Sequence, residues 1–172
     1  YDDAVRVVAQ AQEAFGEDAE SALRLVSLYD EAGRLADAER ALRAMIERDP
    51  LDAVALNYLG YLLADKTDRA PEAVALIERA LEVEPDNPAY LDSLGWALFK
   101  QGKLAEAADP LSRAAAALPA NSVIQDHHGD LLARQGKWSE ATAAWQRALD
   151  GDGESIDRDA IGKKISDARR RR

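Results

Sequence analysis

The sequence lacks several features that would indicate other classes of protein. It has no cysteine, which excludes a disulfide framework and a thiolate metal site. It has no run of about 18 apolar residues, so no segment predicts a membrane-spanning helix. Its first residues are acidic, unlike the basic start of a signal peptide. Proline and glycine are scarce, at 6 and 10 residues, whereas alanine is abundant, and this balance predicts helix along nearly the whole chain.

The formal net charge of −10 is distributed unevenly. Residues 163–172 contain six basic residues against the single acid Asp167, so the rest of the chain is more acidic than the total suggests. An acidic body repels nucleic-acid phosphate and anionic membranes, which disfavours both as main partners. The arginines at 169–172 could attract nucleic acid, but cations at the C-terminus of a helix also complement its dipole, and we favour that interpretation.

Proline and glycine recur at a spacing of 34 or 35 residues. The prolines are Pro50, Pro85 and Pro119, and the glycines are Gly60, Gly95 and Gly129. A second glycine series, Gly33, Gly102 and Gly136, precedes a second helical pattern each time and predicts the turn between two antiparallel helices. A period of this length indicates a stack of helix–turn–helix units.

The period, and the residues that occupy it, resemble the tetratricopeptide repeat family. In the repeat at 88–121 the matching residues are Leu91, Leu94, Gly95, Leu98, Ala107, Leu111, Ala114 and Pro119. The resemblance implies an all-α fold, a right-handed superhelical solenoid of antiparallel helix pairs with a C-terminal capping helix. We expect nine or ten helices in all and no β-sheet.

The register organises the chain as one solenoid domain. The expected elements are the second helix of a truncated repeat at 1–16, four repeats at 19–52, 53–87, 88–121 and 122–155, and a capping helix with a basic tail at 156–172. Because the chain starts in the middle of a repeat, we expect it to be a fragment of a longer protein. The turn at 65–70 is predicted to be one residue longer than its counterparts.

Small residues mark the positions where paired helices should cross. The glycines at 60, 95 and 129 occupy this position on the first helix of a pair. The corresponding residues on the second helices are Ala73, Ala107 and Ala141. A larger side chain at any of these positions is expected to wedge the two backbones apart.

The first helices of stacked repeats line the concave side of such a solenoid, the surface these folds commonly use for partners. The residues that face it by register are Asn57, Tyr61, Asp92, Trp96, Phe99, Asp126 and Asp130. Aromatic rings give contact area at low entropy cost, and carboxylates or amides can bond a peptide backbone. With aspartates and no cation, this set predicts a partner segment with apolar side chains and basic flanks. In the alternative interpretation, Trp96 and Phe99 pack against a neighbouring helix and the acids are only solvated.

One cluster suggests metal binding or catalysis, the run from Asp126 through His127 and His128 to Asp130. Consecutive helical residues are about 100° apart, and the register places His128 in the core and His127 beside the binding face. We therefore predict no catalytic residue, no cofactor and no metal ligand. A self-associating structural spacer is the nearer alternative to a binding scaffold, and a metal-dependent enzyme is the remote one.

The segments at 56–67 and 91–96 also resemble bacterial envelope lipoproteins of the tetratricopeptide repeat family. Some members of that group are adaptors that present substrates to C-terminal-processing proteases. The resemblance implies a protein-binding adaptor or scaffold, a periplasmic protease as a partner, and a location in the bacterial periplasm or at the outer membrane, with the cytoplasm as the alternative. Binding of a terminal carboxylate is not expected, because Asp92, Asp126 and Asp130 stand where such a clamp needs cations.

Overall fold

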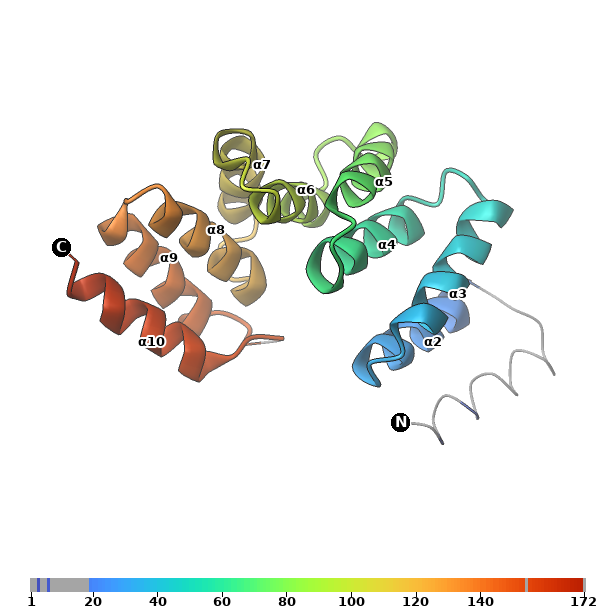
Figure 1. The fold of residues 1–172 in the computed structure, drawn as a ribbon, viewed down its shortest axis with the longest axis horizontal. Coiled ribbons are helices and arrows are strands. Elements are labelled where there is room, and N and C mark those ends of the chain that lie inside the picture. Colours follow the sequence, from blue (N-terminus) through green and yellow to red (C-terminus); the bar gives the residue numbers. More distant parts are fainter. Residues whose placement is uncertain (1–2, 4–5, 7–18, 154, 172) are drawn as a thin grey trace. The chain divides into compact units, whose positions relative to one another are not determined.

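The computed structural model describes residues 3, 6, 19–153 and 155–171 (Figure 1). The part of the chain from residue 19 onward that is described forms helices α2 (Ala19–Glu31), α3 (Leu35–Arg48), α4 (Ala53–Lys66), α5 (Ala70–Val83), α6 (Pro88–Lys100), α7 (Leu104–Ala117), α8 (Ser122–Arg134), α9 (Trp138–Asp150) and α10 (Arg158–Arg169). No strand occurs among the described residues, and the all-α prediction is confirmed there. The helix predicted at 1–16 lies outside the described residues, apart from residues 3 and 6.

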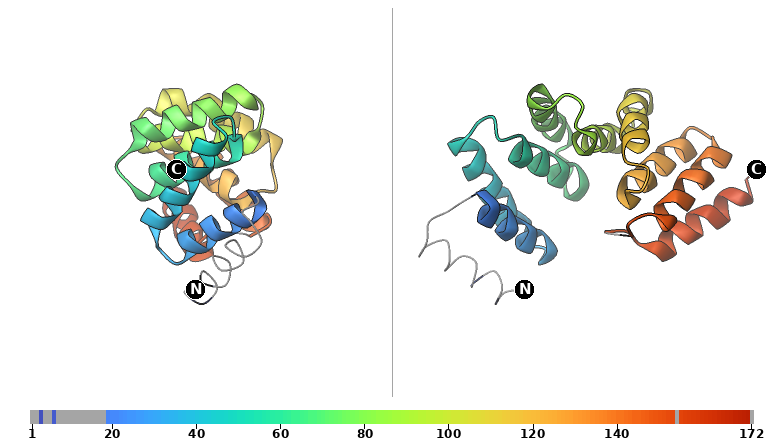
Figure 2. Two further views of the ribbon diagram at one scale, coloured as in Figure 1. Left: turned by 90° about the vertical axis from the view of Figure 1, so that its right-hand side faces the viewer. Right: turned by 180° about the vertical axis from the view of Figure 1, so that it is seen from behind.

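The chain divides into two compact units, residues 1–84 and residues 85–172. The first unit contains the helix pairs α2–α3 and α4–α5, and the second contains α6–α7, α8–α9 and α10. Figure 2 shows these antiparallel pairs from two further directions. The division falls in the segment between α5 and α6. None of the described helices is long and apolar enough to cross a membrane.

Glycine makes the turn inside three of the four helix pairs. Gly33, Gly102 and Gly136 have φ angles of 68°, 76° and 77°, in the left-handed region that glycine enters without a Cβ clash. These three turns are therefore where the sequence predicts them.

The turn after α4 has no glycine and is built differently. Thr67 Oγ1 donates a hydrogen bond to the Leu63 carbonyl at 2.6 Å, and the Arg69 N–H donates one to Thr67 Oγ1 at 3.1 Å. The prediction of a longer turn is wrong: only residues 67–69 separate α4 from α5. The additional residue lengthens the helix instead, since α4 has 14 residues and α6 has 13. Each added helical residue gains a backbone hydrogen bond, which a longer turn would not supply.

The first helix of each later pair begins at a capping side chain. The side-chain oxygens of Asp52 and Asn121 accept bonds from backbone N–H groups of α4 and α8 at 2.9 and 3.0 Å, and Asn87 caps α6 in the same way. A proline stands two residues before each cap. Proline cannot continue the preceding helix, so proline and cap together define the boundary between repeats and account for the recurring prolines.

Paired helices cross closely at the predicted small residues. A Cβ added to Gly95 would lie 2.4 Å from Leu111 Cγ, closer than carbon atoms can approach. A Cβ added to Gly60 or to Gly129 would likewise lie 2.5 Å from the side chain of Ile77 or Trp145, respectively. The alanines assigned to these crossings, Ala73, Ala107 and Ala141, are fully buried. In the first pair the register places Val26 at this position, and it is also fully buried.

Helix α10 covers α9. Its residues Ile161, Ile165 and Ala168 share one apolar core with Trp145 and Leu132. This burial of the last apolar stripe is what a capping helix provides in a repeat stack.

The segment leading into α10 is bonded to the start of α8 and to the loop before it. The Asp152 N–H donates to the Ala120 carbonyl at 2.9 Å, and the Gly153 N–H donates to Ser122 Oγ at 2.8 Å. A Cβ on Gly151 would lie 2.4 Å from the Ala120 carbonyl oxygen, so glycine is required for this approach. We refer to these contacts as the cap clasp.

Candidate functional site

The predicted binding residues of the second unit lie on α6 and α8, and a buried pair joins the two helices. The Asp92 carboxylate oxygens lie 2.9 and 3.1 Å from His127 Nδ1. Only 5% of Asp92 and 6% of His127 are exposed, so Asp92 cannot contact a ligand directly. Burial disfavours the charged imidazole, but the Asp92 carboxylate outweighs this and raises the pKa of His127 above its ordinary value.

The two histidines are placed opposite to the prediction. His127 lies in the core, whereas His128 is only half-buried. The prediction assumed one buried stripe on α8, but this helix packs against α6 and α7 as well as α9 and therefore buries two. Burial and the nearby cations Arg147 and Lys137 lower the pKa of His128.

His127 forms the base of an aromatic stack. Its ring lies 4.0 Å from the Trp96 ring, which in turn stacks on Phe99 at 5.1 Å. Two cations lie over these rings, Lys100 at 5.5 Å from the Trp96 centroid and Arg134 at 5.5 Å from the Phe99 centroid. Both rings remain partly exposed, so they pack against a neighbouring helix and still reach the surface. We refer to Trp96, Phe99, Lys100 and Arg134 as the aromatic–cation face.

The acids predicted to be open to a ligand are paired within the chain. Lys164 of α10 lies 2.9 Å from Asp126 Oδ1 and 2.7 Å from Asp130 Oδ1. The Trp145 indole N–H also donates to Asp130 at 3.0 Å. Burial and the neighbouring Asp130 raise the pKa of Asp126, while the two carboxylates raise the pKa of Lys164 against the effect of its burial. Sequence reasoning missed Lys164, which the repeat register does not place beside these acids.

The run from Asp126 to Asp130 does not gather ligands around one point. His127 faces Asp92, whereas Asp126 and Asp130 face Lys164. Among the described residues, no three histidines, cysteines or acids lie close enough to hold a metal ion.

The remaining predicted binding residues, Asn57 and Tyr61, lie on α4 in the first unit, and both are half-buried. The Asn57 amide oxygen is buried and accepts no hydrogen bond within the part of the chain that the structure describes. A buried acceptor without a donor costs stability, and its burial keeps this oxygen from a ligand, as burial does for Asp92.

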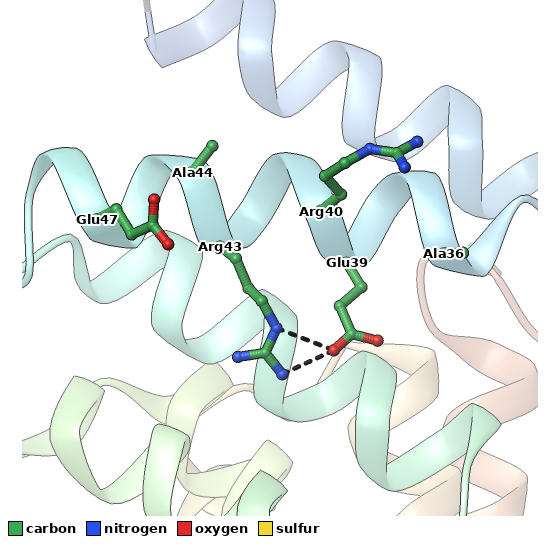
Figure 3. A pocket seen from close by; sticks show the side chains of 6 residues that line it. All are labelled: Ala36, Glu39, Arg40, Arg43, Ala44 and Glu47. Carbon is green, nitrogen blue, oxygen red and sulfur yellow. Dashed lines mark hydrogen bonds and ion pairs between the residues drawn. The ribbon is translucent and has the colours of Figure 1, made fainter.

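A shallow hollow on α3 was not predicted from the sequence. Figure 3 shows its lining side chains, Ala36, Glu39, Arg40, Arg43, Ala44 and Glu47. Arg43 bonds Glu39 and also Glu72 of α5, and Arg69 bonds both of these acids. The pKa of Glu39 falls because the two arginines outweigh its burial, and the pKa of Glu72 falls chiefly through its bond to Arg43. These charges satisfy one another, which favours a packing role over a ligand site.

Stacked helix pairs, crossed at small residues and covered by a terminal helix, define a helical repeat protein. The sequence profile of the tetratricopeptide repeat (TPR) family matches residues 1–53, 23–68 and 63–122. The chain therefore belongs to the tetratricopeptide repeat family, and its fold is an all-α TPR solenoid.

Known proteins share this repeat. The TPR repeat-containing protein PA4667 of Pseudomonas aeruginosa is 51% identical over 80 residues, 46% of this chain and 14% of that protein. The chain thus matches a small part of that relative's length. The structure of TTC0263, a thermophilic TPR protein in Thermus thermophilus, superposes with a TM-score of 0.79 at 19% sequence identity. The match covers 98% of this chain and 90% of the TTC0263 chain. YrrB, described as a TPR protein with an unusual peptide-binding site, has a TM-score of 0.65 at 21% identity, covering 95% of this chain and 82% of its own.

Proposed function

We propose that the chain is a protein-interaction scaffold that binds a segment of another protein through its first helices. The Trp96–Phe99 pair carries the proposal. These two large rings are partly exposed, while His127 stacked on Trp96 and the cations over both rings hold them in one orientation. Rings that are ordered before binding lose little entropy on binding, and such aromatic side chains are common hot spots of interfaces.

The other predicted residues take different roles in this proposal. Asp92 positions His127 beneath Trp96, and Asp126 and Asp130 position Lys164, so these acids act through their partners. In the first unit, the partly exposed Tyr61 supplies apolar contact, whereas the amide oxygen of Asn57 is buried and makes no ligand contact.

The comparisons support a scaffold through the repeat fold. YrrB is a TPR protein described by its peptide-binding site, and its likeness to this chain is one of fold. A role as an adaptor, a periplasmic protease as the partner and an envelope location remain part of the proposal, on the resemblance at 56–67 and 91–96 alone. We propose no enzymatic reaction for this chain.

Panning a random-peptide display library on the purified chain tests the proposal. Retained peptides are synthesised, and their affinities for the parent and for Trp96→Ala are measured by titration calorimetry. Loss of a central aromatic side chain should weaken binding about 30-fold, the equivalent of about 2 kcal/mol. Leu118→Ala is the matched control, since Leu118 is an exposed apolar residue of the same unit in the α7–α8 loop.

Two results would contradict the scaffold proposal. One is binding that is equally tight for the parent and Trp96→Ala. The other is a parent that retains no peptide and self-associates in light scattering, which would instead support the structural spacer. Circular dichroism confirms that each variant stays helical, so that a loss of binding is not a loss of fold.

A further inference from the structure

The charges beside the exposed rings differ from those the sequence predicts. The expected basic flanks of the partner rested on Asp92, Asp126 and Asp130 being open to a ligand. In the structure, His127 and Lys164 hold these three carboxylates. The charged groups that do lie over the exposed rings are both cations, Lys100 and Arg134.

These cations belong to a basic edge that repeats with the helix pairs. Lys100 ends α6 and Lys103 precedes α7, while Arg134 ends α8 and Lys137 precedes α9. All four side chains are exposed. Arg134 lies over the Phe99 ring, so the C-terminal ends of α6 and α8 are side by side.

The end of α10 extends this edge. Arg171 lies 5.1 Å from the centroid of the Trp138 ring, at the start of α9. Figure 1 shows the C-terminal end of α10 beside the α8–α9 turn. We define the basic edge as Lys100, Lys103, Arg134, Lys137 and Arg171.

The basic residues at the turns between paired helices differ between the two units in whether they form ion pairs with acids. In the first unit, Arg34 bonds Asp37 and Arg69 bonds Glu39 and Glu72. Within the described part of the chain, Lys103, Arg134 and Lys137 form no ion pair, although Glu106 and Glu140 follow one helical turn later. Cations also favour helix C-terminal ends, which accounts for Lys100 and Arg134 but not for Lys103 and Lys137 at the starts of helices.

We propose that the aromatic–cation face and the basic edge bind an acidic segment of another protein. This inference rests on the proposed function and specifies its ligand. An apolar side chain of the segment contacts the exposed edges of Trp96 and Phe99, and aspartate or glutamate on either side pairs with Lys100, Arg134 and their neighbours. Opposite charges at the rim of an interface accelerate association and select the partner.

A protein segment fits this face better than a nucleic acid. A base needs a free ring face on which to stack. The Trp96 ring already stacks with His127 and Phe99, and a cation lies over each of the two exposed rings. The partly exposed rings can still make apolar contact with an aliphatic or aromatic side chain. The net charge of −10 also opposes a long polyanion that would extend beyond the edge.

The test uses two fluorescein-labelled synthetic peptides with a central Leu-Phe, one flanked by glutamates and the other by lysines at the same positions. Fluorescence anisotropy measures their affinities for the full chain at low and physiological salt. The glutamate peptide should bind more tightly, and added salt should weaken it. Arg134→Glu should reduce its affinity about tenfold or more.

Arg24→Glu is the matched control, because Arg24 is an exposed arginine of α2 in the first unit and its replacement changes the net charge equally. This variant should retain the affinity of the parent within about twofold, since its charge is not part of the face and is screened by water and salt. An equal loss in both variants would show a general charge effect and overturn the inference.

Other occupants give distinct results. Tighter binding of the lysine peptide, with dependence on Trp96, would overturn the acidic ligand and leave the scaffold proposal intact. Binding of both peptides with affinities that are unchanged in Trp96→Ala would count against both proposals. Binding of neither peptide would overturn the acidic ligand alone. Tighter binding of a labelled oligo-thymidine or of phosphatidylglycerol vesicles, lost in Arg134→Glu, would assign the edge to nucleic acid or to lipid instead.

Discussion

The two units place their charges in different surroundings. In the first unit, Glu39, Glu72, Arg43 and Arg69 join the second helices α3 and α5, and their side chains are 20–41% exposed. In the second unit, Asp92 and His127 join the first helices α6 and α8, and their side chains are 7 and 8% exposed. Water and salt screen the first network, whereas the second pair interacts where screening is weak.

This difference in burial determines what each network can do. Exposed ion pairs contribute little to stability and leave their neighbours free to move. A buried pair must keep both partners, because removal of one leaves the other without compensation. Asp92 and His127 therefore support the orientation of Trp96, and the first unit has no described buried pair of this kind beneath its exposed residues. The helix crossings also differ, since the first pair of helices accommodates Val26 where the later pairs have glycine.

The largest expected effect comes from filling a glycine crossing. Gly95→Leu should lower the free energy of unfolding by about 3 kcal/mol or more, because its side chain must enter space that Leu111 already occupies. Chemical denaturation measures the change. The control is Gly162→Ala in α10, where a Cβ meets nothing within 4 Å and should raise stability by up to about 1 kcal/mol. An unchanged midpoint for Gly95→Leu would show that the crossing is not closely packed.

Removing the buried carboxylate should have the next largest effect. Asp92→Ala should cost about 2 kcal/mol, because the His127 imidazole loses its partner inside the core. Asp109→Ala is the control, since Asp109 is 77% exposed on the side chain and should change stability by less than about 0.5 kcal/mol. Equal losses in the two variants would remove the distinction between buried and exposed charges.

The two histidines should give smaller, opposite dependences of stability on pH. The folded-state pKa of His127 is above the ordinary 6.5. Its stabilising contribution to the free energy of unfolding is therefore fully present below pH 6.5 and is lost as the pH rises through the folded-state pKa. The folded-state pKa of His128 is below 6.5, so its stabilising contribution to the free energy of unfolding is present above pH 6.5 and is lost as the pH falls through the folded-state pKa. Between about pH 6 and 8, the free energy of unfolding should therefore fall with pH in His128→Gln and rise with pH in His127→Gln. Slopes of the same sign in both variants would disprove this assignment.

The smallest effect should come from the exposed network of the first unit. Glu72→Gln removes ion pairs to Arg43 and Arg69, and we expect a loss of about 0.5 kcal/mol or less. The loss should shrink further in 1 M salt, where the Debye length is about 3 Å. A loss as large as that of Asp92→Ala would mean that exposure does not separate the two networks.

The backbone plan could be predicted because it depends on local chemistry. Glycine at a left-handed turn, proline before a helix cap and a small residue at a crossing are each required by the steric limits of one or two residues. These glycine, proline and small-residue positions recur with a period of about 34 residues, and the recurrence fixes the register of the helix pairs. The turn after α4 escaped this reasoning because Thr67 replaces the glycine with a side-chain hydrogen bond.

The candidate site could be predicted only in part. The register identified Trp96 and Phe99, but it could not decide which charges remain open to a ligand, since pairing depends on the facing helices. His127 lies 35 residues from Asp92, and Lys164 lies 38 residues from Asp126 on a helix outside the repeat pattern. A stripe model with one buried side per helix cannot represent α8, which is buried on two sides.

The cap clasp bears on how such an array can grow. The segment leading into α10 is bonded to Ala120 and Ser122, where the last repeat begins, rather than to α9 alone. A tandem duplication of residues 88–121 would again place an Ala120 carbonyl, followed by Asn121, before Ser122, so the cap would keep its attachment and Lys164 its two carboxylates. A repeat inserted after Asp150 would break both. An internal duplication therefore preserves the contacts at the C-terminal end, and the last repeat and α10 form one structural unit that such a duplication leaves intact.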